Sequence, residues 1–300
     1  MAGTKGKGTT CHYCNLLLQE YQRIENISMS IGCYTTPHLV EVRERIQINS
    51  KPISKRLFAK YFQELWSKMD LLLDRPDLET PSVPGYPGFL TLLAIYIYIV
   101  EEIDVAIVET GVGGERDSTN VFRNPTATGI TTIDFDHVET LGNNIEEIAW
   151  HKAGIFKQGS LAFTVMQGED RLRVLRKRAN EKLIRGELQV VTEDIIREYD
   201  IIVEPNLQFQ RLNASLAISL TSAFLDSVYP DFAMTKGLAR SVEKARLPGK
   251  CQIEVDEDIT WFLSVAHNVV SLKETISWFK EFVLRPELVY RLWLAKKESF

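Results

Sequence analysis

A glycine-rich loop that runs directly into a helical pattern is the feature that most constrains this chain. Residues 3–10 read GTKGKGTT. The glycines allow successive backbone N–H groups to turn toward one point, and a helix that starts there adds the positive end of its dipole. Loops of this kind wrap phosphate groups and usually leave the end of a buried strand. The pattern therefore favours an α/β fold with a nucleotide site.

The spacing of the loop leaves a second interpretation open. Lys7 can reach terminal phosphates, and Thr9 or Thr10 can offer a hydroxyl near a magnesium ion. However, Gly8 separates Lys7 from Thr9, which departs from the GxxxxGK[ST] pattern, so a chance run of glycine and lysine is the alternative. If the loop binds a nucleotide, the residues that we assign to it are Thr4, Lys5, Gly6, Lys7, Gly8 and Thr9.

Composition excludes several classes of protein. The chain has 300 residues, of which 45% are hydrophobic, so it is long enough for about two domains. Its 35 basic and 40 acidic residues are interleaved, which gives no basic face for nucleic acid. The most apolar run, at 89–100, is shorter than the roughly 20 residues that cross a bilayer, and we interpret it as a buried helix. Four scattered cysteines indicate a reducing compartment and not a disulfide framework.

Strand-like runs alternate with helical periods along the chain, which predicts βα units and a mostly parallel sheet flanked by helices. We expect strands over 104–110, 126–134, 161–166 and 260–266. We expect helices near 88–102 and over 144–156, 169–184 and 211–225. The basic outer face of the helix over 169–184 is interpreted as a solvated surface. The Pro and Gly of LPGK at 247–250 predict a domain boundary.

Acidic groups follow two of these predicted strands. Glu109 ends the first, and the DFDH sequence at 134–137 follows the next. Strand ends of a parallel sheet converge on one edge, where open α/β folds bind ligands, and carboxylate oxygens suit magnesium. Taken singly, each has a plainer interpretation: a solvated strand terminus for Glu109 and a hydrogen-bonded loop histidine for His137.

The CHYC sequence at 11–14 also has two interpretations. On a helix its two thiols would share a face, but no second CxxC or HxxxH completes a zinc site. The alternative, which we favour, is that Cys11 and Cys14 are small residues that pack the first turns of the helix.

The order of the motifs resembles folylpolyglutamate synthase of the Mur ligase superfamily, apparently of the eukaryotic type. The resemblance covers nearly the whole chain, up to about residue 285, and is specific in combination. It rests on GTKGKGTT at 3–10, YTTPHLVEVRERIQIN at 34–49, VETGVGGERDSTN at 108–120, DHVETLG at 136–142, IAWHKAGIFK at 148–157, QRLNASLA at 210–217, ARLPGK at 245–250 and SVAHN at 264–268.

The resemblance implies an ATP-dependent ligase that adds L-glutamate to the γ-carboxylate of tetrahydrofolate polyglutamates through an acyl phosphate. ATP is then a co-substrate, Mg²⁺ the metal, and a monovalent cation a further candidate. Thr36, Glu109 and His137 fall at the family's magnesium-ligand positions. Lys7, Lys152 and His267 are the expected catalytic residues, and Lys152 matches a lysine that bacterial relatives carry as a carbamate.

Other positions follow the family pattern less closely. Gln210 and Asn213 match its adenine-side helix, and His267 with Asn268 matches its DGAHN motif. Lys250 stands where the family has arginine, which loses the planar guanidinium fork. Ser264 stands where the family has aspartate, which removes charge-assisted hydrogen bonds. Lys250 and Ser264 are both expected at the nucleotide.

The resemblance also predicts a domain division and a shortened chain. Residues 1–246 would form the ATP-binding Mur-ligase-like central domain without its first strand, and 247–300 the start of a Rossmann-like C-terminal domain. We expect a monomeric protein of the cytoplasm, or of the mitochondrion if an upstream leader is lost. Two alternatives remain: a dihydrofolate synthase or bifunctional relative, and a catalytically silent chain that only binds nucleotide.

Overall fold

The computed structural model describes residues 1–73, 83–257, 259–265 and 269–283. Its helices are α1 (Lys7–Glu25), α2 (Lys55–Leu73), α3 (Tyr86–Val100), α4 (Val138–Leu141), α5 (Ile145–Lys152), α6 (Glu169–Glu181), α7 (Asp194–Glu198), α8 (Gln208–Val228), α9 (Lys236–Ala239) and α10 (Val269–Val283), with 3-10 turns η1 (Val42–Arg45), η2 (Ala153–Ile155) and η3 (Arg240–Lys244). Its strands are β1 (Ile31–Tyr34), β2 (Ile46–Ile48), β3 (Lys51–Pro52), β4 (Val105–Val108), β5 (Ala127–Ile130), β6 (Leu161–Val165), β7 (Gln189–Val191), β8 (Gln252–Asp256) and β9 (Ile259–Leu263).

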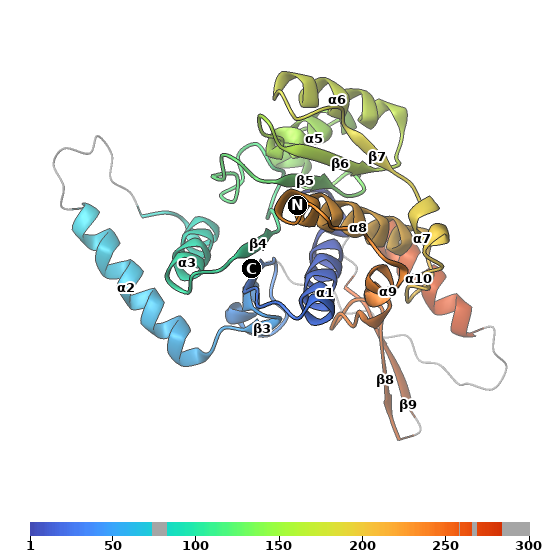
Figure 1. Cartoon of the computed structure of the whole chain (residues 1–300), viewed down its shortest axis with the longest axis horizontal. Helices are drawn as coiled ribbons and strands as arrows, with labels where there is room; N and C mark the ends of the chain where they lie inside the picture. The colour runs from blue at the N-terminus through green and yellow to red at the C-terminus, as the bar shows by residue number, and fades with distance from the viewer. Residues whose placement is uncertain (74–82, 258, 266–268, 284–300) are drawn as a thin grey trace.

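Two sheet segments, one mixed and one parallel, lie at the centre of the chain and are flanked by helices (Figure 1). One has the order β3-β2-β1-β4, in which β1 and β4 are parallel and the β2 and β3 pairings are antiparallel. The other has the order β5-β6-β7 and is parallel throughout. The predicted α/β class and the mostly parallel sheet are thereby confirmed, and each predicted strand is present in shorter form.

Met1 and Ala2 join the two segments. The Met1 α-amino group donates to Val108 O at 2.7 Å, and Ala2 N donates to Gly129 O at 2.9 Å. Ala2 also forms a parallel bridge with Ile130. These two residues therefore occupy the lane between β4 and β5, as the last residues of a strand would, and they place the glycine loop at the carboxyl ends of both strands.

The rest of this lane is hollow. A cavity of about 410 Å³ lies between the facing edges of β4 and β5, and Met1, Leu220 and Phe224 also line it. Burial lowers the pKa of the Met1 α-amino group, which lies at one end of the lane. Within the described residues, the edge of β4 that faces β5 and the edge of β5 that faces β4 therefore have no further strand paired to them.

Three apolar clusters support this framework. In the first, α1 packs against α8 and the inner strands, with Leu17, Ile31 and Leu216 fully buried. In the second, α5 and α6 cover β5 around Ile148 and Phe156. The third joins α2, α3 and β1, as expected for the apolar run at 89–100.

Local signals explain where the helices that carry the site begin and end. The side chain of Asn144 caps α5 by accepting from Glu147 N at 2.8 Å, and acidic residues follow in the first turn. Asn26 ends α1 in the left-handed region that asparagine tolerates. Pro87 lies in the first turn of α3, where its missing N–H costs little.

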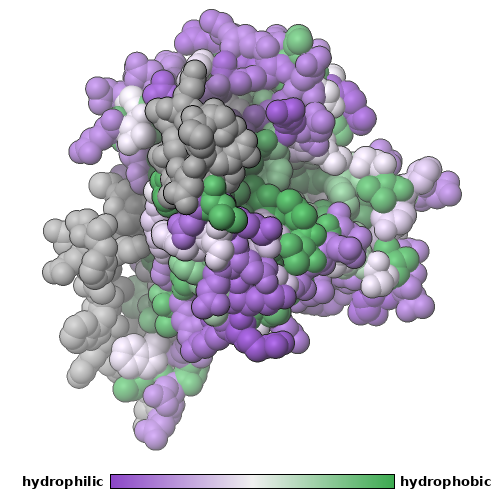
Figure 2. All heavy atoms as spheres, turned by 90° about the vertical axis from the view of Figure 1, so that its left-hand side faces the viewer, coloured by the Kyte–Doolittle hydropathy of each residue, from purple (hydrophilic) through white to green (hydrophobic). Residues whose placement is uncertain are grey.

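Parts of α2 and α3 remain exposed. Figure 2 views the side of the molecule that carries these helices in Figure 1, and apolar patches interrupt its polar surface. Phe62, Trp66 and Tyr86 are 38%, 41% and 57% exposed, and the Phe62 and Trp66 rings stack with centroids 6.0 Å apart. No helix of the described residues is both long and apolar enough to span a bilayer.

The β8–β9 hairpin and α10 make up the described part of the chain beyond residue 250, and Figure 1 shows the hairpin projecting from the body. Trp278 of α10 is buried against Phe262 of β9, so this part has a small cluster of its own. The division at residues 246 and 247 stays a prediction.

An added strand should fill the lane between β4 and β5. We expect an extension of four or five apolar, β-branched residues ahead of Met1 to raise the midpoint of thermal unfolding by several degrees. It would replace a buried amine by a neutral amide and pair with both strand edges. Calorimetry measures the shift. An extension of equal length rich in proline is the control, and equal midpoints for the two would contradict the prediction.

Candidate functional site

The glycine loop lies over the carboxyl end of β5. Thr4 N donates to Thr132 O at 2.9 Å, while the Thr4 hydroxyl donates to Asp134 O at 2.9 Å and accepts from Asp134 N at 3.0 Å. Gly6 then caps α1 in the left-handed region, and Thr10 N closes the first turn on Gly6 O. The loop and the DFDH segment are thereby joined at one sheet edge.

Two glycines of the loop have no room for a side chain. A Cβ on Gly3 would lie 1.8 Å from the Thr131 hydroxyl oxygen, and Gly3 has φ of 138°. A Cβ on Gly6 would lie 2.1 Å from Asn213 Oδ1, and Gly6 has φ of 87°. Sterics and backbone conformation therefore both require glycine at these positions.

Two lysines converge on one carbonyl of this loop. Lys7 Nζ donates to Gly3 O at 3.0 Å, and Lys152 Nζ donates to the same oxygen at 2.9 Å. Burial, with the nearby charge of Lys7, lowers the pKa of Lys152 to about 7. Lys152 also lies in the last turn of α5, where a helix dipole favours a cation.

A third lysine reaches the loop from the LPGK sequence. A Cβ on Gly8 would lie 2.7 Å from Lys250 Nζ and 3.2 Å from Glu109 Oε2, so both side chains approach this glycine. Lys250 therefore lies beside the loop, and its contact with a nucleotide stays a prediction. The start of α1 is thus surrounded by cationic groups and free backbone N–H groups, an arrangement that attracts a polyphosphate.

Thr36 and Glu109 meet at the ends of paired strands. Tyr34 of β1 is in register with Val108 of β4, so Thr36 and Glu109 follow parallel strands at the same edge. Thr36 N donates to Glu109 Oε2 at 2.9 Å, and Glu109 is buried. The resemblance alone placed Thr36 with Glu109, and their role as metal ligands stays a prediction.

His137 lies at the start of α4 with a left-handed backbone, and its Nε2 is 3.7 Å from Asp136 Oδ2. Within the described part of the chain, no hydrogen bond or ion pair joins it to Thr36 or Glu109, and no group of three or more His, Cys, Asp or Glu side chains is arranged to hold a metal. The set of Thr36, Glu109 and His137 stays a prediction.

The donor atoms beside the glycine loop nevertheless suit Mg²⁺. Glu109 offers a buried carboxylate, and the Thr10 hydroxyl oxygen is buried without a hydrogen-bond partner. Hard oxygen donors of this kind are the ligands that Mg²⁺ prefers, usually together with phosphate oxygens. Glu109, with a threonine of the loop, would therefore hold the ion.

The remaining predicted site residues differ in their surroundings. Gln210 and Asn213 are buried, bond to each other at 3.3 Å, and place Asn213 against Gly6. Lys5 Nζ is 4.0 Å from Glu274 of α10. The Ser264 hydroxyl bonds to the Thr275 hydroxyl at 3.1 Å. His267 and Asn268 lie outside the described residues.

Two residues near the site were not predicted from the sequence. Asp117 accepts from Gly111 N at 2.9 Å, Val112 N at 2.8 Å and Thr119 N at 3.0 Å, and so shapes the loop after β4. An aspartate between a glycine run and a threonine is a signal for such a turn. His12 follows on α1, where burial and Lys250 lower its pKa to about 4; its sequence carries no comparable signal.

The CHYC pair packs inside the protein. Cys11 and Cys14 are buried on α1, and Cys14 lies in the first apolar cluster. Burial raises the pKa of the Cys14 thiol to about 12. The packing interpretation is confirmed.

Comparison with known proteins identifies relatives of this architecture. No family model matches the chain. It is 42% identical to folylpolyglutamate synthase of Neurospora crassa over 94% of this chain and 54% of that protein. It is 35% identical to the mitochondrial folylpolyglutamate synthase of Homo sapiens over 94% of this chain and 50% of that protein.

The chain is a homologue of folylpolyglutamate synthases. It spans about half the length of the curated relatives it matches. Among solved structures, the apo form of L. casei FPGS matches with a TM-score of 0.80 and 23% identity, over 94% of this chain and 70% of that one. Mycobacterium tuberculosis folylpolyglutamate synthase complexed with ADP matches with a TM-score of 0.75 and 24% identity, over 92% and 64%. These two likenesses confirm the fold.

Gly3→Ala should disrupt the loop. The added methyl group would meet Thr131 in a backbone conformation that alanine avoids, so we expect a loss of about 2 kcal/mol or more in the free energy of unfolding and weaker nucleotide binding. Gly237→Ala is the control, because nothing lies within 4 Å of a Cβ there. Denaturant unfolding measures the difference, and equal stability of both variants would contradict the steric account.

Lys152 should make stability depend on pH. Its folded pKa of about 7 lies below the ordinary value of 10.5, so the unfolded chain binds more protons between these pH values. The free energy of unfolding should therefore rise with pH across this window, by about 1.4 kcal/mol per pH unit from this group. Lys152→Met should lose that contribution. Urea titrations at several pH values test this, and identical slopes for both proteins would refute it.

Proposed function

We propose that this chain is the nucleotide-binding part of an ATP-dependent ligase that adds L-glutamate to the γ-carboxylate of tetrahydrofolate polyglutamates. The observation that carries the proposal is the glycine loop at the start of α1, with Lys7, Lys152 and Lys250 around it and Glu109 beside it. The names of the relatives support the substrate class, and a similar solved structure is an FPGS complex with AMPPCP and folate.

The chemistry would proceed in two steps. An oxygen of the γ-carboxylate attacks the γ-phosphorus of ATP, so that an acyl phosphate forms and ADP leaves. The amino group of glutamate then attacks the acyl carbon, and phosphate leaves as the amide bond forms. Mg²⁺, when bound, would neutralise charge on the phosphate oxygens.

The residues of this chain would contribute mainly positioning and charge. Backbone N–H groups at the start of α1 would bind phosphate oxygens, and Lys7 would exchange its bond to Gly3 O for a terminal phosphate. Glu109 would hold the metal. His267 falls outside the described residues, so its catalytic role stays a prediction.

Lys152 has the properties that carbamylation requires. The reaction joins a neutral amine to carbon dioxide, and the lowered pKa of Lys152 leaves a large neutral fraction near pH 7. Its amine lies 2.9 Å from Gly3 O, next to the phosphate loop. We extend the proposal to a carbamate at this position, which would replace a cation by an anion.

The two departures from the family pattern favour binding over ligation. Lys250 keeps a charge beside Gly8 but lacks the guanidinium fork. Ser264 bonds to Thr275 and offers no carboxylate. Ligation requires two substrates to be held in the reactive geometry, and this positioning can supply roughly 7–11 kcal/mol of a bimolecular barrier. We therefore expect these 300 residues to bind Mg-ATP weakly and not to ligate glutamate at a useful rate.

Calorimetric titration with Mg-ATP tests the binding half of the proposal. We expect saturable binding by the chain, and at least tenfold weaker binding by Lys7→Met, because the side chain that would meet the terminal phosphates is lost. Lys177→Met on the exposed side of α6 is the control. Absence of binding to the unaltered chain would refute the proposal.

Incubation with ATP, magnesium, tetrahydrofolate and labelled glutamate tests the ligase half. A chain extended at both ends, with Lys250→Arg and Ser264→Asp, should incorporate label, and the unextended chain should not. Dihydropteroate as the acceptor distinguishes a dihydrofolate synthase. If the extended chain incorporates no label with either acceptor, the ligase proposal is wrong and the protein only binds nucleotide.

The wider setting is also a proposal. We expect a monomer that takes folates and glutamate as its small-molecule partners, in the cytoplasm or the mitochondrion. Relatives named as mitochondrial are compatible with the second location.

A further inference from the structure

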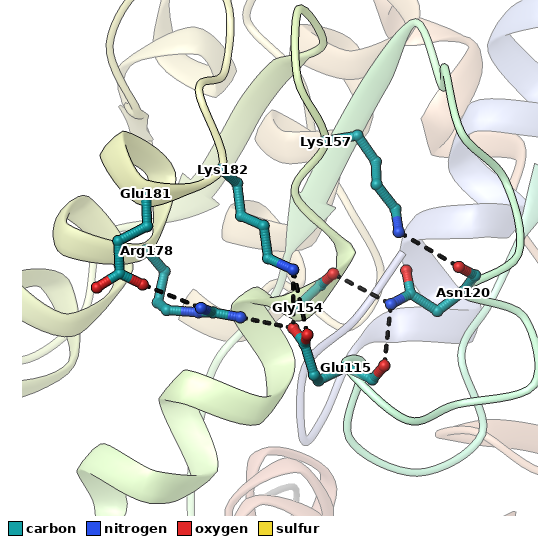
Figure 3. Close-up of polar contacts among 7 residues, drawn as sticks. All are labelled: Glu115, Asn120, Gly154, Lys157, Arg178, Glu181 and Lys182. Carbon is teal, nitrogen blue, oxygen red and sulfur yellow. Dashed lines mark hydrogen bonds and ion pairs between the residues drawn. The ribbon is translucent and has the colours of Figure 1, made fainter.

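A partly buried ion cluster around the buried Arg178 holds the loop over residues 111–120, which follows Glu109, against α6 (Figure 3). Arg178 Nη2 donates to Glu115 Oε2 at 2.5 Å, and Lys182 Nζ donates to Glu115 Oε1 at 3.1 Å. Arg178 Nη1 also donates to Glu181 Oε2 at 2.9 Å. We call the pair of Glu115 and Arg178 the clamp.

Arg178 corrects the sequence-based prediction that the charged face of this helix is solvated. Its side chain is only 9% exposed, and its guanidinium carbon lies 4.2 Å from the centroid of the Trp150 ring. Its Nε is buried without a hydrogen-bond partner. Other arginines of α6, such as Arg173 and Arg176, are exposed as predicted.

The energetics of the clamp indicate a role other than stability. Burying a guanidinium and leaving one of its N–H groups unpaired both cost free energy. Apolar residues of similar volume often replace buried ion pairs with little loss of stability. What the ion pair supplies here is a fixed direction, because the planar fork of arginine reaches Glu115 and Glu181 at once.

The clamp acts on the last turn of α5, which carries Lys152. Glu115 N donates to His151 O at 2.7 Å. Asn120 Nδ2 donates to both Glu115 O at 3.1 Å and Gly154 O at 3.2 Å, and Figure 3 shows this amide between the two backbone segments. A Cβ on Gly114 would lie 2.7 Å from Lys152 O, so the loop backbone is in close contact with this turn.

We propose that Arg178 is a positioning residue that, through Glu115, holds the loop over residues 111–120 against the end of α5 and so keeps Lys152 directed at Gly3 O. The loop over residues 111–120 follows Glu109 in the chain. Helix α5, which this loop contacts, carries Lys152, and Lys152 Nζ bonds to Gly3 O of the glycine loop. Among the described residues, no hydrogen bond or ion pair joins Arg178 itself to Glu109 or Lys152. Its effect on nucleotide binding rests on the proposed function, whereas its effect on the loop does not.

The test compares Arg178→Met, Arg178→Lys and Glu115→Gln with Arg176→Met, an exposed control on the same helix that pairs with Glu169. Hydrogen exchange of backbone amides reports the loop and the end of α5 separately from the rest. We expect Arg178→Met to speed exchange over 111–120 and 150–155 about tenfold, with the other segments unchanged. Arg176→Met should change neither segment.

Conservative rescue and Mg-ATP affinity complete the experiment. Arg178→Lys keeps the charge and should restore part of the protection, and Arg178→Met with Glu115→Gln should show less than the sum of the single effects. Mg-ATP should bind several-fold more weakly to Arg178→Met. Unchanged exchange in Arg178→Met, or faster exchange over the whole chain, would overturn the proposal. If exchange over 111–120 and 150–155 is faster in Arg178→Met but the unaltered chain does not bind Mg-ATP, the clamp is supported and the proposed function is refuted.

Discussion

The carbonyl oxygen of Gly3 organises the candidate site. It accepts from Lys7 on α1 and from Lys152 on α5, so two lysine amines are held near one another at the point where the chain leaves the sheet. Such an arrangement is costly, and burial of Lys152 beside Lys7 lowers its pKa accordingly. An anion placed at the start of α1 would relieve this repulsion and gain the helix dipole as well. The electrostatics of the loop therefore favour a phosphate group.

That interaction depends on the sheet beneath it. Met1 and Ala2 fix the position of Gly3 because they bond to Val108 and Gly129. Thr36 and Glu109 follow the paired strands β1 and β4 and so lie at the same edge. The lane between β4 and β5 is only partly occupied, and the cavity within it is lined by Met1, two residues ahead of Gly3.

Much of this could be predicted from sequence. Alternating strand and helix patterns located β4, β5, β6, α3, α5 and α8, because their apolar periods are strong and their ends carry clear signals. The place of Glu109 at the carboxyl edge followed from the rule that parallel strand ends share an edge. Thr36 was expected beside it only from the family resemblance, because its strand β1 was not predicted. The burial of Arg178 could not be predicted, because its partners Glu115 and Trp150 are distant in sequence and its helix is otherwise charged. β8 was also missed: its five residues alternate polar and apolar side chains, but the run is short and mostly exposed.

The central claim is that the loop over residues 3–10 binds the phosphates of a nucleotide whose metal ion lies at Glu109. A crystal structure of the chain with magnesium and a non-hydrolysable ATP analogue tests it most directly. The account predicts phosphate oxygens within hydrogen-bond distance of the Gly6 to Thr9 amides, Lys7 turned away from Gly3 O toward the terminal phosphate, and the ion in contact with a Glu109 oxygen. Analogue bound elsewhere, with Lys7 and Lys152 both still bonded to Gly3 O, would contradict it.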